Sequence, residues 1–146
     1  MFFLAVREDY LCEKKKMKPR SRNKETGRQG ETVALAWLER RGFRVLAQNW
    51  RGGHGEIDLV MESGRAVHIV EVKTLTPPLL ALPAQKVDAA KQARLVAAAR
   101  RFLVENRIER EVQFDIVAVI LDGGDPRVEY IPEAFYPICS SGGRHI

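Results

Sequence analysis

The sequence contains few cysteines. Cys12 and Cys139 are the two cysteines of the 146-residue chain, and they lie near opposite ends without a neighbour at metal-ligand spacing. This pattern predicts no disulfide framework and indicates a reducing compartment. We therefore expect a cytoplasmic protein.

The chain also lacks a long apolar run. The apolar stretch that begins at Met1 ends at Arg7, before a signal-peptide core of about 7–15 residues could form. No run approaches the roughly 20 apolar residues of a membrane span. We expect no membrane association. Hydrophobic residues nevertheless make up 45% of the chain, which is enough to bury a core.

Most of the chain has no net charge. Residues 1–30 hold nine of the 24 basic residues and four of the 19 acidic ones, so the net charge of +5 lies there and residues 31–146 are neutral. This disfavours a uniformly basic nucleic-acid clamp. We interpret residues 1–26 as a basic, flexible arm that either binds nucleic acid or only improves solubility. Residues 27–135 are the predicted folded domain, and residues 136–146 a flexible tail.

Two helices are predicted from apolar periodicity and capping residues. The first spans about residues 27–41, because Thr26 begins a capping-box pattern and Gly42 suits the position after a helix end. The second spans about residues 89–106, with Asp88 as its N-cap.

Five segments have the composition of strands, and with the helices they give the order αβββαββ of a mixed α/β domain. The fourth is almost wholly apolar, as in a buried central strand, and the fifth is typical of a short edge strand. The predicted strands are Phe43–Trp50, Glu56–Glu62, Ala66–Lys73, Val112–Leu121 and Arg127–Ile131.

The second and third strands form a predicted hairpin that brings acidic residues together. If Ser63 and Gly64 are its two-residue turn, Asp58 faces Ile69 and Glu71 lies diagonally beside Asp58. A slip of one residue would move Asp58 to the opposite face, so this prediction depends on the turn.

Two carboxylates facing each other across a strand pair repel, and this arrangement favours a cation site. Mg²⁺ typically binds one or two carboxylates and keeps several waters. Lys73 projects from the same face as Asp58 and Glu71, where it could orient or deprotonate a water molecule, or stabilise charge on a phosphate. Glu31 lies within the apolar arc of the first helix, which would carry it to the same site if that arc packs on the sheet.

These residues form a pattern that resembles a known superfamily. The Gly55-Glu56-Ile57-Asp58 strand, the Glu71-Val72-Lys73 strand and the Gly30-Glu31 helix resemble the PD-(D/E)XK nucleases. More narrowly, the chain is similar to the YraN family, relatives of archaeal Holliday-junction resolvases. The resemblance covers roughly residues 27–135. It implies a restriction-endonuclease-like fold with a mixed central sheet flanked by helices and an αβββαβ core.

The resemblance also implies a function and a site. The protein would be a Mg²⁺- or Mn²⁺-dependent endonuclease that hydrolyses phosphodiester bonds in DNA, with branched or structured DNA as candidate substrates. Asp58, Glu71 and the carbonyl of Val72 would bind the metal, Glu31 would be a further ligand, and Lys73 would be the catalytic lysine.

Two departures from the family pattern favour alternatives. Leu75 stands where relatives generally carry arginine, and the apolar loop 74–83 replaces a polar one. The apolar loop suggests a flap or a self-association surface, such as a homodimer contact. The alternative functions are a nucleic-acid-binding module that does not cleave, or a protein-interaction role with this loop as the contact surface. Lys91, His54 and Arg51 are candidates for nucleic-acid contacts, although Lys91 also fits an ordinary solvated lysine.

Each site residue has a simpler interpretation as well. Asp58 and Glu71 could be solvated acids with Lys73 as their ion-pair partner, and Glu31 a carboxylate favoured by the helix dipole. Glu56 is either an outer acid of the site or an arginine partner. Asp115, in an apolar strand, is either a site residue or a carboxylate satisfied by hydrogen bonds.

Overall fold

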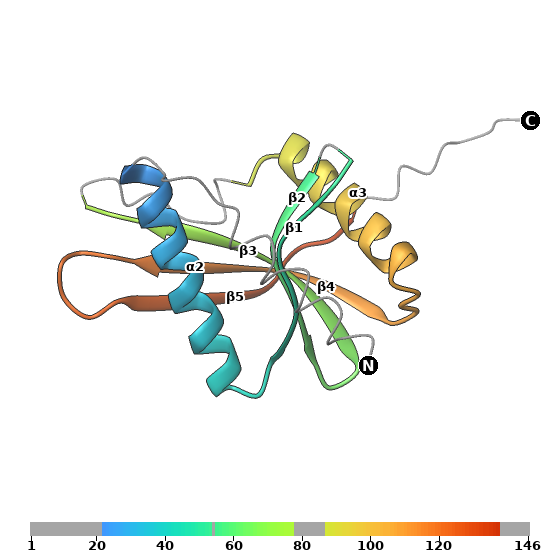
Figure 1. The fold of residues 1–146 in the computed structure, drawn as a ribbon, viewed down its shortest axis with the longest axis horizontal. Coiled ribbons are helices and arrows are strands. Elements are labelled where there is room, and N and C mark those ends of the chain that lie inside the picture. The colour runs from blue at the N-terminus through green and yellow to red at the C-terminus, as the bar shows by residue number, and fades with distance from the viewer. Residues whose placement is uncertain (1–21, 54, 78–86, 138–146) are drawn as a thin grey trace, which may run out of the picture.

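In the part of the chain that the structure describes, two helices pack against one five-stranded sheet (Figure 1). The computed structural model describes residues 22–53, 55–77 and 87–137. The strands lie in the order β1-β2-β3-β4-β5, and neighbouring strands are antiparallel except β3 and β4, which are parallel. This confirms the predicted mixed α/β fold of the restriction-endonuclease type. The elements are α2 (Arg22–Arg40), β1 (Arg44–Gly52), β2 (Gly55–Ser63), β3 (Ala66–Leu75), α3 (Ala89–Glu105), β4 (Glu111–Ile120) and β5 (Arg127–Phe135).

The helix ends agree only in part with the sequence prediction. α2 starts at Arg22, so the prediction that Thr26 caps it is wrong, because Thr26 lies inside the helix. Gly42 follows the end of α2 as predicted, with a φ of +89° that a side chain would strain. Asp88 is the N-cap of α3, and its Oδ1 accepts a hydrogen bond of 2.8 Å from the amide of Lys91. In the described ranges, neither helix is long and apolar enough to cross a membrane.

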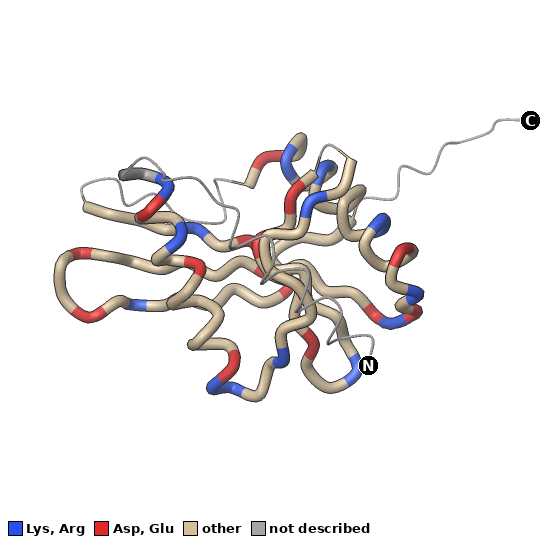
Figure 2. Tube along the Cα trace, in the orientation of Figure 1, with Lys and Arg blue, Asp and Glu red and all other residues tan. Residues whose placement is uncertain are grey.

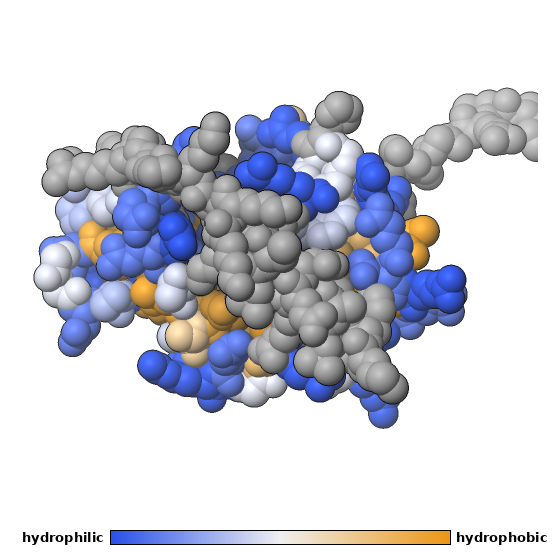
Figure 3. All heavy atoms as spheres, viewed as in Figure 1, coloured by the Kyte–Doolittle hydropathy of each residue, from blue (hydrophilic) through white to orange (hydrophobic). Residues whose placement is uncertain are grey.

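Each helix packs on its own set of strand side chains. Leu38 of α2 belongs to a core cluster with Val70, whereas Phe102 of α3 belongs to another with Ile69. Successive side chains of β3 therefore point alternately toward α2 and α3, because strand side chains alternate between faces. Hydrophobic side chains also reach the surface in patches beside α2 (Figure 3).

The turn of the β2–β3 hairpin lies one residue later than predicted. Ser63 pairs with Ala66, so Gly64 and Arg65 form the turn, and the expected Ser63-Gly64 turn is wrong. Gly64 takes the first central position, with a φ of +57°. This position of a two-residue hairpin turn requires a positive φ, which glycine adopts without strain.

Because the turn lies one residue later, the residues of β2 pair with different residues of β3 than predicted. Leu59 pairs with Val70, so the predicted pairing of Asp58 with Ile69 is wrong. Continuing this register puts Asp58 opposite Glu71 instead of diagonal to it. The displacement is two residues, an even number, so within the paired stretch the shift by itself moves no side chain to the opposite face.

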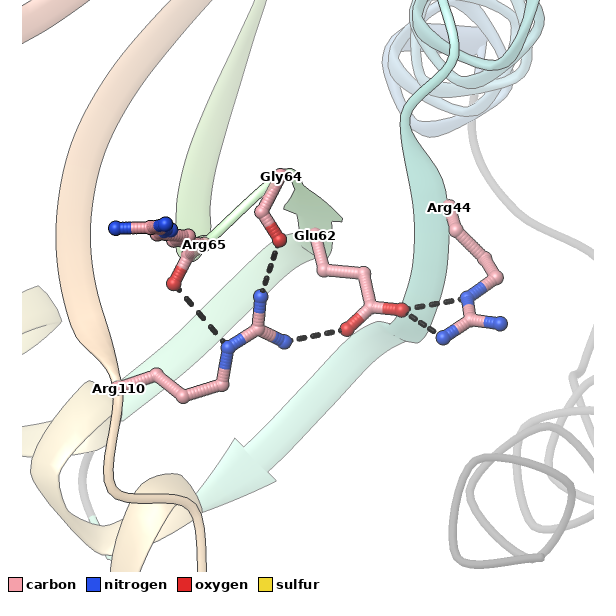
Figure 4. Close-up of polar contacts among 5 residues, drawn as sticks. All are labelled: Arg44, Glu62, Gly64, Arg65 and Arg110. Carbon is pink, nitrogen blue, oxygen red and sulfur yellow. Dashed lines mark hydrogen bonds and ion pairs between the residues drawn. The ribbon is translucent and has the colours of Figure 1, made fainter.

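A compensated charge cluster lies beside this turn (Figure 4). The Arg110 guanidinium donates to Glu62 Oε2 at 2.6 Å and to the carbonyls of Gly64 and Arg65 at 2.8 and 3.2 Å. Arg44 binds the other oxygen of Glu62. A surface depression of about 470 Å³ borders this cluster. The guanidinium groups of Arg44 and Arg110 both already bind Glu62, and through Arg110 the cluster connects the hairpin to the start of β4.

The remaining strands follow the prediction closely. β4 lies between β3 and β5, with residues 114–119 buried. β5 is the edge strand that was expected, but it continues to Phe135, beyond the predicted end at Ile131. Phe135 stacks on Phe114 with ring centroids 5.1 Å apart, which extends the core under the end of this strand.

Candidate metal centre

The candidate site lies where β2 separates from β3. The paired register of the hairpin ends at Leu59 and Val70. Two residues further along β3, the amide of Val72 donates to Asp58 Oδ2 at 2.9 Å. The Asp58 carboxylate thus replaces a backbone acceptor on β2, and this fixes its position between the two strands.

Glu71 and Lys73 lie on the α3 side of β3, as the alternation of its side chains requires. The Glu71 side chain is 5% exposed, and the Lys73 side chain is 18% exposed. Lys73 Nζ lies 3.4 Å from Glu71 Oε1. The structure therefore places the two residues of the E-V-K pattern in direct contact in a nearly buried position.

Lys91 completes this contact from the first turn of α3. Its Nζ forms an ion pair with the same oxygen, Glu71 Oε1. The sequence indicated either a nucleic-acid contact or a solvated side chain at this position, and neither described this ion pair. Lys91 precedes Leu95 and Ala98 by four and seven residues on the buried stripe of α3, and this spacing would have placed it on the sheet side of the helix.

The electrostatics of the site reflect crowded carboxylates. Burial raises the pKa of Asp58 well above its usual value, and the negative charges of Glu71 and Glu31 raise it further, against the opposing effect of the Val72 hydrogen bond. A raised pKa means that the ionised form of Asp58 is disfavoured in this position. A cation beside Asp58 would relieve that unfavourable interaction.

The two lysines are shifted in opposite directions. Burial lowers the pKa of Lys73, and the neighbouring Lys91 lowers it further. Burial alone would lower the pKa of Lys91 too, but its hydrogen bond and charge attraction to Glu71 outweigh burial and raise it. Lys91 is thus the more firmly protonated of the pair.

Glu31 reaches this region because α2 approaches β3 closely. A Cβ on Gly30 would lie 1.8 Å from Thr74 Oγ1, so only glycine fits between the helix and the strand without displacement. Glu31 follows Gly30, is half-buried, and its charge acts on Asp58. The expectation that α2 would bring Glu31 near Asp58 is confirmed to this extent.

The donor set fits a hard divalent cation in part. Asp58 and Glu71 supply two carboxylates, and Mg²⁺ commonly binds one or two together with waters. Among the described residues, no three acidic, histidine or cysteine side chains are already gathered as a ligand group. A cation would therefore complete its shell with water, with backbone oxygen, or with Glu31 after a side-chain movement.

The remaining candidates either contact other residues or lie outside the described residues. Arg51 is exposed and lies 3.7 Å from Glu56, so Glu56 has the arginine partner that one of its two interpretations expected. His54 lies outside the described residues. Trp50 packs edge-on against Phe102 and so belongs to the core rim.

Asp115 is fully buried and satisfied by hydrogen bonds. Its carboxylate lies 2.6 Å from His68 Nδ1 and accepts from the Tyr130 hydroxyl at 2.6 Å. The Gln113 side chain and the Glu133 amide each donate at 2.9 Å. Burial alone would raise the pKa of Asp115, but these hydrogen bonds lower it. The expected role as a satisfied carboxylate is confirmed, with strand residues as the partners.

Comparison with known proteins identifies the family. The profile of "Uncharacterised protein family UPF0102" matches residues 30–119, more than half of the chain. The chain belongs to the UPF0102 family. It is 42% identical to a UPF0102 protein of Bacteroides thetaiotaomicron over 113 residues, which cover 77% of this chain and 93% of the relative.

Two further UPF0102 proteins show the same relationship. The relative from Anaeromyxobacter dehalogenans is 44% identical over 110 residues, covering 75% of this chain and 82% of the relative. The relative from Geobacter metallireducens is 36% identical over 114 residues, covering 77% of this chain and 93% of the relative. The UPF0102 match spans Asp58, Glu71, Lys73 and Lys91, and it confirms the resemblance to YraN-like proteins at the level of this family.

Proposed function

We propose that this UPF0102 protein is a divalent-metal-dependent endonuclease of the PD-(D/E)XK type that hydrolyses phosphodiester bonds in DNA. One observation carries the proposal: Asp58 and Glu71 come together with Lys73 where β2 and β3 separate, and the environment of Asp58 disfavours its charge. Two crowded carboxylates beside a lysine do not stabilise a fold, but they suit a metal that activates water for attack on a phosphate.

Under this proposal each residue has a distinct task. Asp58 and Glu71 would hold Mg²⁺ or Mn²⁺, and Glu31 would bind it directly or through water. The Val72 amide faces β2 through its bond to Asp58, and the carbonyl of a strand residue points to the same neighbour as its amide, so this carbonyl is a fourth candidate ligand. The metal would lower the pKa of a bound water and polarise the phosphate. Lys73 would orient the attacking water or stabilise the developing negative charge.

Cleavage assays test the proposal directly. The wild type would be incubated with labelled duplex, single-stranded and four-way DNA in the presence of Mg²⁺ or Mn²⁺. We expect metal-dependent cleavage that falls at least about 100-fold in Glu71→Ala and in Lys73→Ala, since each removes a group acting on the reacting atoms.

Glu56→Ala is the matched control for these variants. Glu56 is an exposed acid two residues from Asp58 on the same strand, and it pairs only weakly with Arg51. Its removal should change the cleavage rate less than about twofold. Cleavage that survives both site variants would show that these residues are not the catalytic ones.

One observation favours a second candidate function, a DNA-binding module that does not cleave. Leu75 stands where the family pattern places arginine, and it is buried, with its carbonyl accepting a hydrogen bond from the Leu121 amide at 2.9 Å. This position therefore offers no side chain to a phosphate backbone. DNA binding without cleavage under any metal condition would support this candidate over the nuclease.

A further inference from the structure

The ion pair between Lys91 and Glu71 joins the second helix to the candidate metal centre. Lys91 Nζ contacts Glu71 Oε1, and Lys73 Nζ approaches the same atom at 3.4 Å. Two ammonium groups therefore converge on one carboxylate oxygen whose side chain is 5% exposed. Such a buried carboxylate needs compensating positive charge, and here the protein itself provides it.

Lys91 is held in this position by the start of α3. Asp88 caps the helix through the Lys91 amide at 2.8 Å, which fixes the backbone at the point where the side chain leaves it. Leu95 and Ala98 are buried on the same stripe, so the helix itself directs Lys91 toward the sheet. The Lys91 side chain remains 35% exposed, and this leaves it a path outward to solvent.

A metal ion and the Lys91 ammonium would compete for Glu71. Both are cations that require the same carboxylate, and Lys91 also acts on Asp58 through its charge. Lys73 differs because it lies on β3 only two residues from Glu71 and is half as exposed as Lys91, so it has less freedom to leave. Binding of two cations to one site is mutually unfavourable, and each must weaken the other by the same factor.

We propose that Lys91 is a built-in counter-ion of the metal centre, which occupies Glu71 until a divalent cation displaces it and which is then free to turn toward a phosphate at the rim. This inference rests on the proposed function, because it takes Asp58 and Glu71 as the metal ligands. It assigns Lys91 a positioning role that sets metal affinity.

Metal titration of the purified full-length chain tests the inference without a nucleic-acid substrate. Mn²⁺ binding would be measured by isothermal titration calorimetry for the wild type and for Lys91→Met, which keeps the length of the side chain but not its charge. We expect Lys91→Met to bind Mn²⁺ about tenfold more tightly, because the competing ammonium is gone. An unchanged or weaker affinity would overturn the inference.

Two further variants serve as controls. Arg94→Met removes a positive charge from the exposed position one helical turn later and should leave Mn²⁺ affinity within about twofold of the wild type. Lys91→Arg keeps a cation on Glu71 and should not tighten binding. If Lys91→Met fails to fold, Lys91→Arg still tests the inference. Tighter Mn²⁺ binding by Lys91→Arg than by the wild type would contradict it.

The same titration separates failure of this inference from failure of the proposed function. Asp58→Asn should abolish Mn²⁺ binding if the metal centre is correct. Binding that is lost in Asp58→Asn but equal in the wild type and Lys91→Met would reject only the role of Lys91. Binding that is absent from the wild type, or unaffected by Asp58→Asn, would reject the metal centre and with it both proposals.

Discussion

Asp58 and Asp115 are two aspartates of the same sheet, and their surroundings shift their pKa values in opposite directions. Asp115, on β4, has four hydrogen-bonding partners around a fully buried carboxylate, and together they lower its pKa. Asp58, on β2, accepts one backbone hydrogen bond and lies near two other acids, and its pKa is raised. The fold therefore stabilises the ionised form of Asp115 and disfavours the ionised form of Asp58.

This difference makes Asp58, and not Asp115, the candidate ligand of a cation. A carboxylate that the protein satisfies completely contributes to the fold, whereas one that remains crowded by like charges is a candidate for binding a cation. Glu62 illustrates the first type again, because Arg44 and Arg110 bind its two oxygens (Figure 4). Acidic and basic positions are scattered over the whole fold (Figure 2), so charge alone would not distinguish these sites.

The largest expected effect concerns Asp115. Asp115→Ala would leave His68, Gln113, Tyr130 and the Glu133 amide without their shared acceptor. We expect a loss of about 3 kcal/mol or more in the free energy of unfolding, since unsatisfied buried donors cost about 1–3 kcal/mol each. Urea unfolding followed by circular dichroism measures this.

The exposed acid Asp122 provides the control for this experiment. Asp122 forms a surface ion pair of 3.5 Å with Arg127, so Asp122→Ala should change the free energy of unfolding by less than about 0.5 kcal/mol. A loss below about 1 kcal/mol in Asp115→Ala would mean that the hydrogen-bond network is not a main stabilising feature.

A smaller effect is expected from the glycine that brings α2 to Asp58. In Gly30→Ala the new Cβ would overlap Thr74 Oγ1, and we expect a loss of about 2 kcal/mol in stability. Gly27→Ala is a matched control in the same helix, where nothing lies within 4 Å of a new Cβ. It should stabilise the protein by up to about 1 kcal/mol, since alanine favours helices. Thermal unfolding of both variants gives the comparison, and equal shifts would contradict the close packing of α2 on β3.

The smallest expected effect is a gain in stability, whereas the two effects above are losses. Asp58→Asn removes one negative charge from the crowded centre, while the asparagine oxygen can still accept from the Val72 amide. We expect the protein to become more stable by about 1 kcal/mol in the absence of divalent metal. Added Mg²⁺ should stabilise the wild type but not this variant.

Glu56→Gln is the control for the Asp58 variant, because it removes an acid of the same strand that is exposed. Its stability should not change with or without Mg²⁺. If Asp58→Asn were instead clearly destabilising, Asp58 would belong with Asp115 as a structural carboxylate, and the contrast between the two would be lost.

Local patterns in the sequence predicted the candidate site with partial success. Strand alternation placed Glu71 and Lys73 on one face, and an error of one residue in the turn did not change this, because the pairing moved by two. The pairing partner of Asp58 was predicted wrongly, since glycine fits either central position of a two-residue turn. Chain periodicity cannot distinguish those two positions.

Contacts between distant segments could not be predicted from the sequence. Three of the four partners of Asp115 come from other strands, His68 from β3 and Tyr130 and Glu133 from β5, and no spacing along the chain relates them to Asp115. The fourth, Gln113, lies two residues earlier on β4. The contact of Gly30 with Thr74 likewise depends on how α2 crosses the sheet. Such crossings are set by the packing of complete helix and strand surfaces, which the sequence specifies only through the whole fold.

The sequence by itself determined the element order, the mixed α/β class, the cap of α3 and the residue types of the candidate centre. These follow from periodicities and caps that act within a few neighbouring residues. Only the tertiary structure decided that Asp58 replaces a backbone acceptor, that Lys91 binds Glu71, and that Asp115 is satisfied while Asp58 is not. The physical reason is that pKa and ion pairing depend on distances between side chains from different elements, and those distances exist only once the helices have packed on the sheet.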